Sequence, residues 1–259
     1  MRMLPAFLLV LLFQAGTVQG DEPKRINTDN NAPPLSYYED FNQQPNVFLM
    51  DMVRGMKPGK ALDVAMGTGR NAVYLGTLGW DVTGFDISEM DIRIAVEKAR
   101  EAGTKINTVA QDVATFDFGK NQWDLVVLSY VPFARVIVDK VHESLKPGGV
   151  VMLEFFHRDS LKMRLLAHDL TFADNELLQI FSKYRILHYE DVLAKQDWGL
   201  SHGSNNRLVR LWAQKKDLLS PAECTLEDRP YPEEAEVCWH GTKVVCSRAG
   251  WVTKAGKCG

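Results

Sequence analysis

Residues 62–72 read LDVAMGTGRNA and carry the most informative pattern of the sequence. It opens with a short apolar run typical of a buried strand, and a helix-forming run begins near Arg70. Between them, Gly67 and Gly69 supply a turn at which the backbone can approach a ligand with no Cβ in the way. The free N–H groups at the start of the following helix favour a polar ligand. The stretch therefore predicts a strand–turn–helix unit with a ligand at the glycine turn.

Short apolar runs alternate with helix-length segments on both sides of this unit. We expect strands at residues 61–65, 80–86, 105–112, 123–130, 150–156, 184–192 and 206–214. We expect helices at residues 47–56, 70–79, 88–103, 136–145 and 174–182. Strands that alternate with helices form a mostly parallel sheet with helices on both faces. The pattern predicts an α/β fold with a doubly wound, seven-stranded sheet.

An acid follows the glycine turn at the end of the second expected strand. Asp86 stands there, where a carboxylate can accept hydrogen bonds from both ribose hydroxyls of an adenosine. Residues 67–72 also satisfy the G-x-G-x-x-A pattern of dinucleotide-binding domains. An NAD-dependent oxidoreductase is therefore one alternative, although the sequence shows no evident catalytic Tyr-x-x-x-Lys.

Four segments, in this order, resemble the class I S-adenosylmethionine-dependent methyltransferases, in particular the small-molecule branch with the tellurite-resistance-type enzymes. They are LDVAMGTGRNAVYLGTLGWDVTGFDIS (62–88), AQDV (110–113), FDFGKNQWDLVVLSYV (116–131) and LKPGGVVMLEFF (145–156). A domain that binds NAD has no reason to carry Asp112 or the Lys-Pro-Gly-Gly turn. The resemblance extends from about Pro45 to Lys215. It implies a Rossmann-like fold and S-adenosylmethionine as cofactor.

The resemblance also implies the residues of the cofactor site. Asp63 would orient the methionine amino group, Asp86 would hold the ribose, and Asp112 would face the adenine amino group. The expected set is Asp63, Ala65, Gly67, Gly69, Arg70, Asp86, Ile87, Asp112, Val113 and Ser129. Arg70 would meet the methionine carboxylate or pair with a nearby acid at the surface. The family usually has glycine where this chain has Ala65, and alanine fits if its φ stays negative.

Methyl transfer from a sulfonium needs few catalytic groups from the protein. The sulfonium already makes the methyl group electrophilic, so transfer is an in-line displacement that depends on positioning. A general base is needed only for a weakly nucleophilic acceptor, so no catalytic residue is assigned. Weaker candidates for contact with the acceptor are Tyr37, Tyr38, Tyr130 and His157. For His157, a solvent-facing loop position is the stronger expectation, and no metal site is predicted.

Composition narrows the choice of partner. The formal net charge is −3 and the basic residues form no long run, so nucleic acid is not an expected partner. A small-molecule methyl acceptor is the default expectation, and the oligomeric state stays open.

Both ends of the chain indicate export. Arg2 and an apolar run at residues 4–13 have the form of a secretory signal peptide. The run is far shorter than the ~20 residues of a membrane-spanning helix, so no stable span is expected after cleavage. The cysteines all lie near the other end: Cys224, Cys238, Cys246 and Cys258. In an exported chain they predict two disulfides, with three possible connectivities.

These observations divide the chain into four expected parts. They are a signal peptide (1–20), an irregular N-terminal arm (21–46), a methyltransferase domain (47–215) and a Cys-containing extension (216–259). We expect Trp239 and Trp251 to pack a small disulfide module inside the extension rather than to bind sugar or peptide. The expected location is periplasmic or secreted, and an anchored or cytoplasmic chain is the alternative if the signal is not cleaved. Because S-adenosylmethionine is made in the cytosol, an exported, non-catalytic binding module with this fold is a second alternative.

Overall fold

The computed structural model describes residues 42–163, 168–199, 202–216, 224–227, 229–231, 234–240, 242–247 and 250–255. The expected signal peptide, Tyr37, Tyr38 and Cys258 lie outside the described residues. Contacts divide the chain into Met1–Ala32 and Pro33–Gly259, and the described residues belong to the second unit. Among them, no helix is long and apolar enough to cross a membrane.

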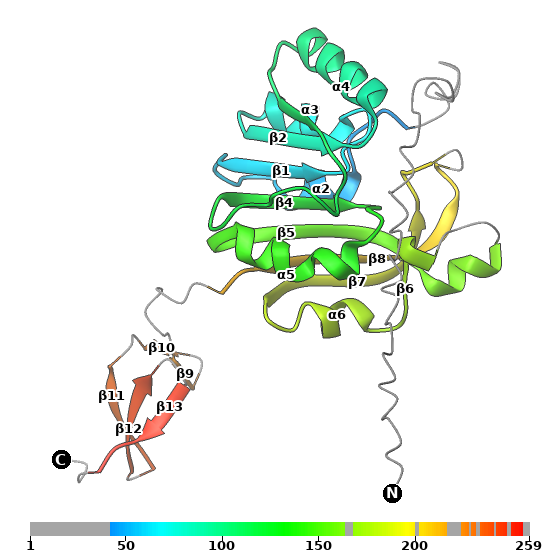
Figure 1. Ribbon diagram of the computed structural model, residues 1–259. Helices are drawn as coiled ribbons and strands as arrows, with labels where there is room; N and C mark the ends of the chain where they lie inside the picture. Colours follow the sequence, from blue (N-terminus) through cyan, green and yellow to red (C-terminus); the bar gives the residue numbers. More distant parts are fainter. Residues whose placement is uncertain are drawn as a thin grey trace, which may run out of the picture. The chain divides into compact units, whose positions relative to one another are not determined.

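One large sheet forms the centre of the described chain (Figure 1). Its strands are β1 (Lys60–Val64), β2 (Asp81–Asp86), β3 (Asn107–Ala110), β4 (Trp123–Ser129), β5 (Leu145–His157), β6 (Thr171–Phe172), β7 (Arg185–Lys195) and β8 (Asn205–Gln214). The strand order is β3-β2-β1-β4-β5-β8-β7, and β6 pairs with β5 beside this path. All pairings are parallel except those of β8 with β5 and β7.

The expectation of a mostly parallel α/β sheet is confirmed, with one correction. The sheet has eight strands rather than seven. The additional strand is β6, only two residues long, which pairs with Phe156 and His157 at the far end of β5. A strand this short carries no alternating pattern that a sequence could reveal.

Helices cover both faces of the sheet, as expected. They are α2 (Val47–Met52), α3 (Arg70–Thr77), α4 (Glu89–Glu101), α5 (Ala134–Ser144) and α6 (Glu176–Ile180), with 3-10 turns η1 (Arg158–Met163) and η2 (His168–Leu170). Alternate residues along the strands belong to two separate hydrophobic cores, one on each face of the sheet. Leu62 and Val126 pack with α5 and α6 on one face, whereas Ala61 and Leu125 pack with α2, α3 and α4 on the other. A period of two along each strand therefore separates the two cores.

Local chemistry sets where several elements begin and end. The Ser88 side chain caps α4 by accepting a hydrogen bond from the Asp91 N–H at 3.2 Å. Helix α2 ends at Met52, short of the expected residue 56, and the chain then turns through Gly55 with a φ of +78°. The Lys-Pro-Gly-Gly segment lies within β5 as an irregularity, because Trp123 pairs with Leu145 while Leu125 pairs with Val150.

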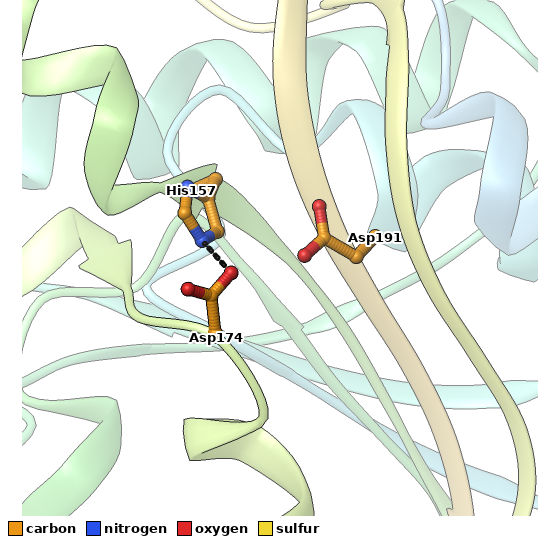
Figure 2. Close-up of side chains that lie close together, drawn as sticks. All are labelled: His157, Asp174 and Asp191. Atoms are coloured by element: carbon orange, nitrogen blue, oxygen red, sulfur yellow. Dashed lines mark hydrogen bonds and ion pairs between the residues drawn. The ribbon is translucent and has the colours of Figure 1, made fainter.

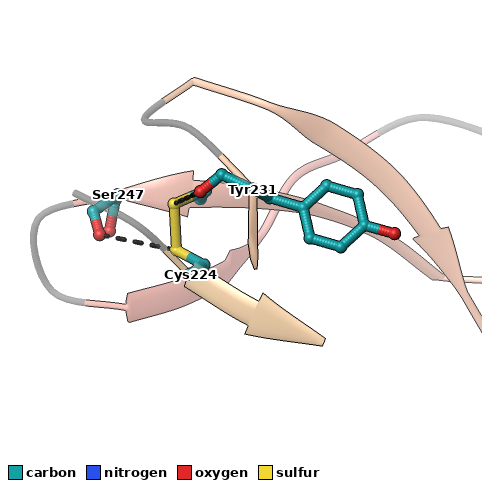
Figure 3. Close-up of a disulfide and its surroundings, with 4 residues drawn as sticks. Cys224, Tyr231 and Ser247 are labelled. Atoms are coloured by element: carbon teal, nitrogen blue, oxygen red, sulfur yellow. Dashed lines mark hydrogen bonds between the residues drawn. A yellow bond between two sulfur atoms is a disulfide. The ribbon is translucent and has the colours of Figure 1, made fainter. Parts of the chain in front are cut away.

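The described residues from 224 onward form two small sheets. Strands β9 (Cys224–Leu226) and β10 (Arg229–Tyr231) form one, and β11 (Glu236–Trp239), β12 (Thr242–Ser247) and β13 (Gly250–Thr253) form the other. A disulfide joins Cys224 of β9 to Cys246 of β12 (Figure 3). Cys238 is also disulfide-bonded. The prediction of disulfide bonding in this region is therefore confirmed for the described cysteines.

Candidate functional site

A pocket of about 260 Å³ opens where β1 and β4 end. From β1 the sheet continues through β2 and β3 on one side and through β4 and β5 on the other, so the strand order reverses here. Open α/β sheets bind ligands at this reversal, outside the carboxyl ends of the strands. The lining residues are Asn42, Asp63, Ala65, Met66, Gly67, Thr68, Arg70, Asn71, Asp91, Ser129, Trp198 and Gly199.

Asp63 is the most unusual group in this pocket. Its side chain is buried, with 2% of its surface exposed, and its Oδ2 has no hydrogen-bond partner. Burial raises the pKa of Asp63 to about 7, against the opposing effects of the Ala72 N–H and the Arg70 charge. A buried acceptor atom without a partner is costly, so its retention beside a pocket indicates a ligand that donates a hydrogen bond or carries positive charge.

The two glycines of the turn serve different purposes. Gly67 has a φ of +54°, and a Cβ added there would meet nothing within 4 Å, so the turn leaves open space beside the pocket. Gly69 has a φ of +77°, and a Cβ added there would lie 2.6 Å from the Cβ of Ala95. Gly67 therefore gives a ligand room, whereas Gly69 allows α3 to pack closely on α4.

Ala65 lines the pocket in a strained backbone conformation. Its φ is +50°, in the left-handed region, so the condition under which alanine fits this position, a negative φ, is not met. A side chain in this region brings its Cβ close to the following carbonyl oxygen. The glycine that the family usually carries at this position would therefore be less strained than Ala65.

The residues expected at the adenosine lie along the same sheet edge but outside the lining of this pocket. Asp86, at the end of β2, accepts hydrogen bonds from the N–H groups of Gly67 at 2.8 Å and Ser88 at 2.9 Å. Ile87 beside it is 56% exposed. Asp112, after β3, is exposed and accepts from the Ala114 N–H at 2.8 Å. Val113 is half-buried. Their contact with an adenosine stays a prediction.

Arg70 lines the pocket and is bonded to a neighbouring acid, and its contact with a ligand carboxylate stays a prediction. Its Nη2 lies 2.9 Å from Oδ1 of Asp197, and its Nη1 donates to the carbonyl oxygens of Gln44 and Asp197, each at 3.0 Å. Only 10% of the Arg70 side chain is exposed, so this is a buried ion pair and not the surface pair that was the alternative. Arg70 thus joins the start of α3 to the connection between β7 and β8.

Tyr130 lies behind the pocket rather than in its lining. Its hydroxyl donates to Oε1 of the fully buried Glu154 at 2.7 Å, and Asn46 and Arg210 bond the same carboxylate at 2.8 and 2.6 Å. Burial, together with the Glu154 charge, raises the pKa of Tyr130 well above its ordinary value. The Tyr130 ring stacks on Trp198, with centroids 5.2 Å apart, and so supports a residue that does line the pocket.

The expectation that His157 faces solvent is wrong. His157 ends β5 and is buried, because β5 extends this far and pairs with β6. Its Nε2 lies 3.2 Å from Oδ1 of Asp174, and its Nδ1 accepts from the Asp159 N–H at 3.1 Å. His157 does not line the pocket.

Figure 2 shows that His157, Asp174 and Asp191 converge, and their donor atoms lie within 4.8 Å of one another. The cation at this cluster is Arg207 of β8. Its guanidinium binds Asp191 through two nitrogens at 2.7 and 2.8 Å and Asp174 at 3.0 Å. The cluster is therefore an ion-pair network that joins β7 and β8 to the segment after β6.

Seven residues of the lining were not predicted from the sequence. They are Asn42, Met66, Thr68, Asn71, Asp91, Trp198 and Gly199. Met66, Thr68 and Asn71 lie within residues 62–72, so their proximity to the turn was an available signal. Trp198 comes from the connection between β7 and β8, and its position depends on where the two antiparallel strands end.

Comparison with known proteins agrees with this geometry. Residues 61–149 match the family model described as a methyltransferase domain. The chain is 29% identical over 150 residues to the probable S-adenosyl-L-methionine-dependent methyltransferase TehB of Haemophilus influenzae (strain 10810), covering 55% of this chain and 52% of that protein. It is 30% identical over 126 residues to the putative methyltransferase YqeM of Bacillus subtilis (strain 168), covering 46% and 50%. The chain thus spans about half the length of these curated relatives.

Solved structures show the same fold. The crystal structure of TehB from Haemophilus influenzae aligns with a TM-score of 0.56 at 23% identity, covering 66% of this chain and 62% of that one. The magnesium protoporphyrin IX methyltransferase of Synechocystis PCC 6803, solved with bound SAH, aligns with a TM-score of 0.50 at 19% identity, covering 65% and 80%.

The sheet order, the pocket at the strand reversal and the family match define a class I S-adenosylmethionine-dependent methyltransferase domain. Within that class, the domain is similar in sequence and in fold to the tellurite-resistance protein TehB. S-adenosylmethionine is the cofactor of the class, and the NAD-dependent alternative is set aside.

Proposed function

We propose that this chain transfers the methyl group of S-adenosylmethionine to a small-molecule acceptor by in-line displacement. The observation that carries the proposal is the buried carboxylate of Asp63, whose Oδ2 has no hydrogen-bond partner and lines a pocket at the strand reversal. The α-ammonium group of the methionine moiety is a cationic donor that suits this atom.

Two further features fit the same cofactor. The Ser129 hydroxyl, on the opposite side of the strand reversal, is buried and has no hydrogen-bond partner, so it suits the methionine carboxylate. The turn at Gly67 leaves open space where a side chain would otherwise stand. The adenosine would then extend towards the ends of β2 and β3, along Asp86, Ile87, Asp112 and Val113.

The chemistry divides simply between cofactor and protein. When bound, the cofactor supplies a methyl group on a sulfonium, which is already electrophilic. Asp63 orients the methionine end and stays ionised there, because the ammonium charge lowers the pKa of its carboxyl. Trp198, supported by the stacked ring of Tyr130, excludes water beside Ser129.

The acceptor is expected to arrive with its own nucleophilic lone pair. Tyr130 keeps its proton at neutral pH, because its pKa is raised by burial and by Glu154, so it does not serve as a general base. A thiol, amine or oxyanion of small size meets this requirement. Because the chain carries a formal net charge of −3, we do not propose nucleic acid as the acceptor.

Transfer of a labelled methyl group tests this function directly. The protein is incubated with methyl-labelled S-adenosylmethionine and panels of small thiols, amines and oxyanions, with Asp86→Ala as the inactive comparison. We expect label in at least one acceptor and little with Asp86→Ala. If the protein binds the cofactor but labels no small molecule, the small-molecule proposal fails and a macromolecular acceptor replaces it.

We also propose that the chain is exported and that it has four parts. These are a signal peptide (1–20), an N-terminal arm (21–46), a methyltransferase domain (47–215) and a C-terminal extension (216–259). The disulfide between Cys224 and Cys246 supports an oxidising compartment, because cytosolic thiols are kept reduced. N-terminal sequencing of protein from the extracytoplasmic fraction should begin at Asp21. Recovery of the chain with Met1 from the cytoplasm would contradict export.

A further inference from the structure

The sheet of β11, β12 and β13 has two chemically different faces. In its register Trp239 pairs with Thr242, Val244 with Thr253, and Cys246 with Trp251. Cross-strand partners share a face, so the first face carries both tryptophans and two threonines. The opposite face carries Glu236 and Lys243.

Charge gathers on that opposite face. Glu236 forms ion pairs with both Lys243 and Lys254, and these two cations lower the pKa of Glu236 to about 2. The first face has a pocket of about 540 Å³ lined by Leu226, Trp239, His240, Thr242, Val244, Trp251 and Thr253. Among these lining residues there is no lysine, arginine, aspartate or glutamate.

The two tryptophans differ in how they are held. The expectation that both pack inside the extension is wrong for Trp239, because 45% of its surface is exposed. Its ring lies beside that of His240, with centroids 4.8 Å apart. Trp251 is half-buried and meets Tyr231 edge-on at 5.5 Å. One indole is thus presented at the rim of the pocket while the other is fixed in its wall.

A disulfide stabilises the floor of the pocket. Cys246 lies on the same strand as Val244, is 1% exposed, and is bonded to Cys224. This bond holds β9, which contributes Leu226, beside β12. Figure 3 shows this disulfide beside Tyr231 and Ser247, whose carbonyl oxygens contact its sulfur atoms. A covalently fastened wall loses little conformational entropy when a ligand binds, so the pocket is preorganised.

We propose that this pocket binds a neutral carbohydrate. The C–H bonds on one face of a pyranose ring are weakly positive and apolar, and they stack on the negative face of an indole. The hydroxyl groups at the ring edge need hydrogen-bonding side chains, which Thr242, Thr253 and His240 provide. A pocket with aromatic walls, a few polar groups and no charge suits a ligand that is polar yet uncharged.

This inference is independent of methyl transfer. It rests on β9 to β13 alone and uses no residue of the pocket at β1 and β4. Binding of sugar would not show methyl transfer, and an inactive methyltransferase site would leave the sugar pocket intact.

Calorimetry on the full chain, with its disulfides intact, tests the proposal. The probes are chitohexaose, cellohexaose and maltohexaose as neutral sugars, heparin as a charged one, and a proline-rich peptide as a different ligand of aromatic surfaces. We expect binding of at least one neutral hexasaccharide, weakened at least about tenfold in Trp239→Ala and largely kept in Trp239→Phe. The matched control is Val252→Ala, which removes an exposed apolar side chain from the opposite face and should change nothing.

Three results would overturn the proposal. They are no binding of any neutral sugar by the folded wild-type chain, equal binding by wild type and Trp239→Ala, and binding of heparin or the peptide alone. Near-UV circular dichroism of Trp239→Ala and Trp239→Phe confirms that each variant is folded.

Discussion

Arg70 and Asp197 are 127 residues apart in the sequence, yet their side chains form a buried ion pair with Nη2 and Oδ1 2.9 Å apart. The pair joins the first turn of α3, beside the glycine turn, to the connection that carries Trp198. Asp197 also accepts from the Val47 N–H at 3.0 Å, so the start of α2 is held at the same point. One carboxylate therefore connects three segments around the pocket.

Replacement of Asp197 should lower the free energy of unfolding. Asp197→Ala leaves Arg70 buried without its partner, and we expect a loss of about 3–5 kcal/mol in the free energy of unfolding. Urea denaturation measures it. The control is Asp51→Ala, since Asp51 and Arg54 form an exposed pair with side chains 54% and 78% exposed, worth about 0–1 kcal/mol. Equal costs in the two variants would contradict a structural role for the buried pair.

Relief of strain at Ala65 should stabilise the protein. Its φ of +50° costs a non-glycine residue about 1–2 kcal/mol, whereas glycine adds about 0.4–1 kcal/mol of unfolded-state entropy. We expect Ala65→Gly to raise the free energy of unfolding by about 0.5–1 kcal/mol. Ala102→Gly, at an exposed position with a φ of −77°, serves as control and should be destabilising. A destabilising Ala65→Gly would show that the left-handed conformation carries no strain.

Asp63 should make stability fall as pH rises. Its folded pKa, about 7, lies above the ordinary value of 3.8, so between these values the folded state holds a proton that the unfolded chain has lost. The unfolded state then binds fewer protons than the folded state. As far as it depends on Asp63, the free energy of unfolding is therefore highest below pH 3.8, falls progressively up to about pH 7, and is constant above pH 7. Asp63→Asn should therefore be more stable than wild type at pH 8, by on the order of 3 kcal/mol, and equal to it near pH 4. Equal denaturation midpoints at both pH values would refute the raised pKa.

Tyr130 should prove a support rather than a base. In Tyr130→Phe, Glu154 keeps its bonds to Asn46 and Arg210, so we expect a loss of about 1 kcal/mol in stability and an unchanged pH profile of kcat. Arg210→Ala should cost about 3–5 kcal/mol, because it leaves Glu154 buried and unpaired. A pH profile that loses a limb in Tyr130→Phe would instead make the Tyr130 hydroxyl a proton acceptor.

The part of the site that was predictable is local in sequence. Gly67 follows from the glycine turn, whereas Asp63 and Ser129, at or near the ends of expected strands, were implied by the family resemblance; the structure places all three in the lining of one pocket. Hydrophobic runs of ordinary length also gave the sheet and most of the helices, since each run carries its own periodicity.

The site residues that could not be predicted owe their positions to the pairing of strands. Trp198 reaches the pocket, and Asp197 reaches Arg70, because β7 and β8 pair antiparallel over their length, which no local pattern records. His157 is buried because the two-residue strand β6 extends the sheet at that point. The positive φ of Ala65 was also beyond prediction, because the turn geometry overrides the preference of alanine for a negative φ.

Calorimetric titration at pH 8 with S-adenosylmethionine, S-adenosylhomocysteine and NAD is the decisive measurement for the cofactor site. We expect micromolar binding of the two sulfur nucleosides, no binding of NAD, and a loss of at least about tenfold in affinity in Asp63→Asn, which removes the charge that meets the ammonium group. Failure of the folded protein to bind either sulfur nucleoside, or binding unchanged in Asp63→Asn, would contradict the site described here.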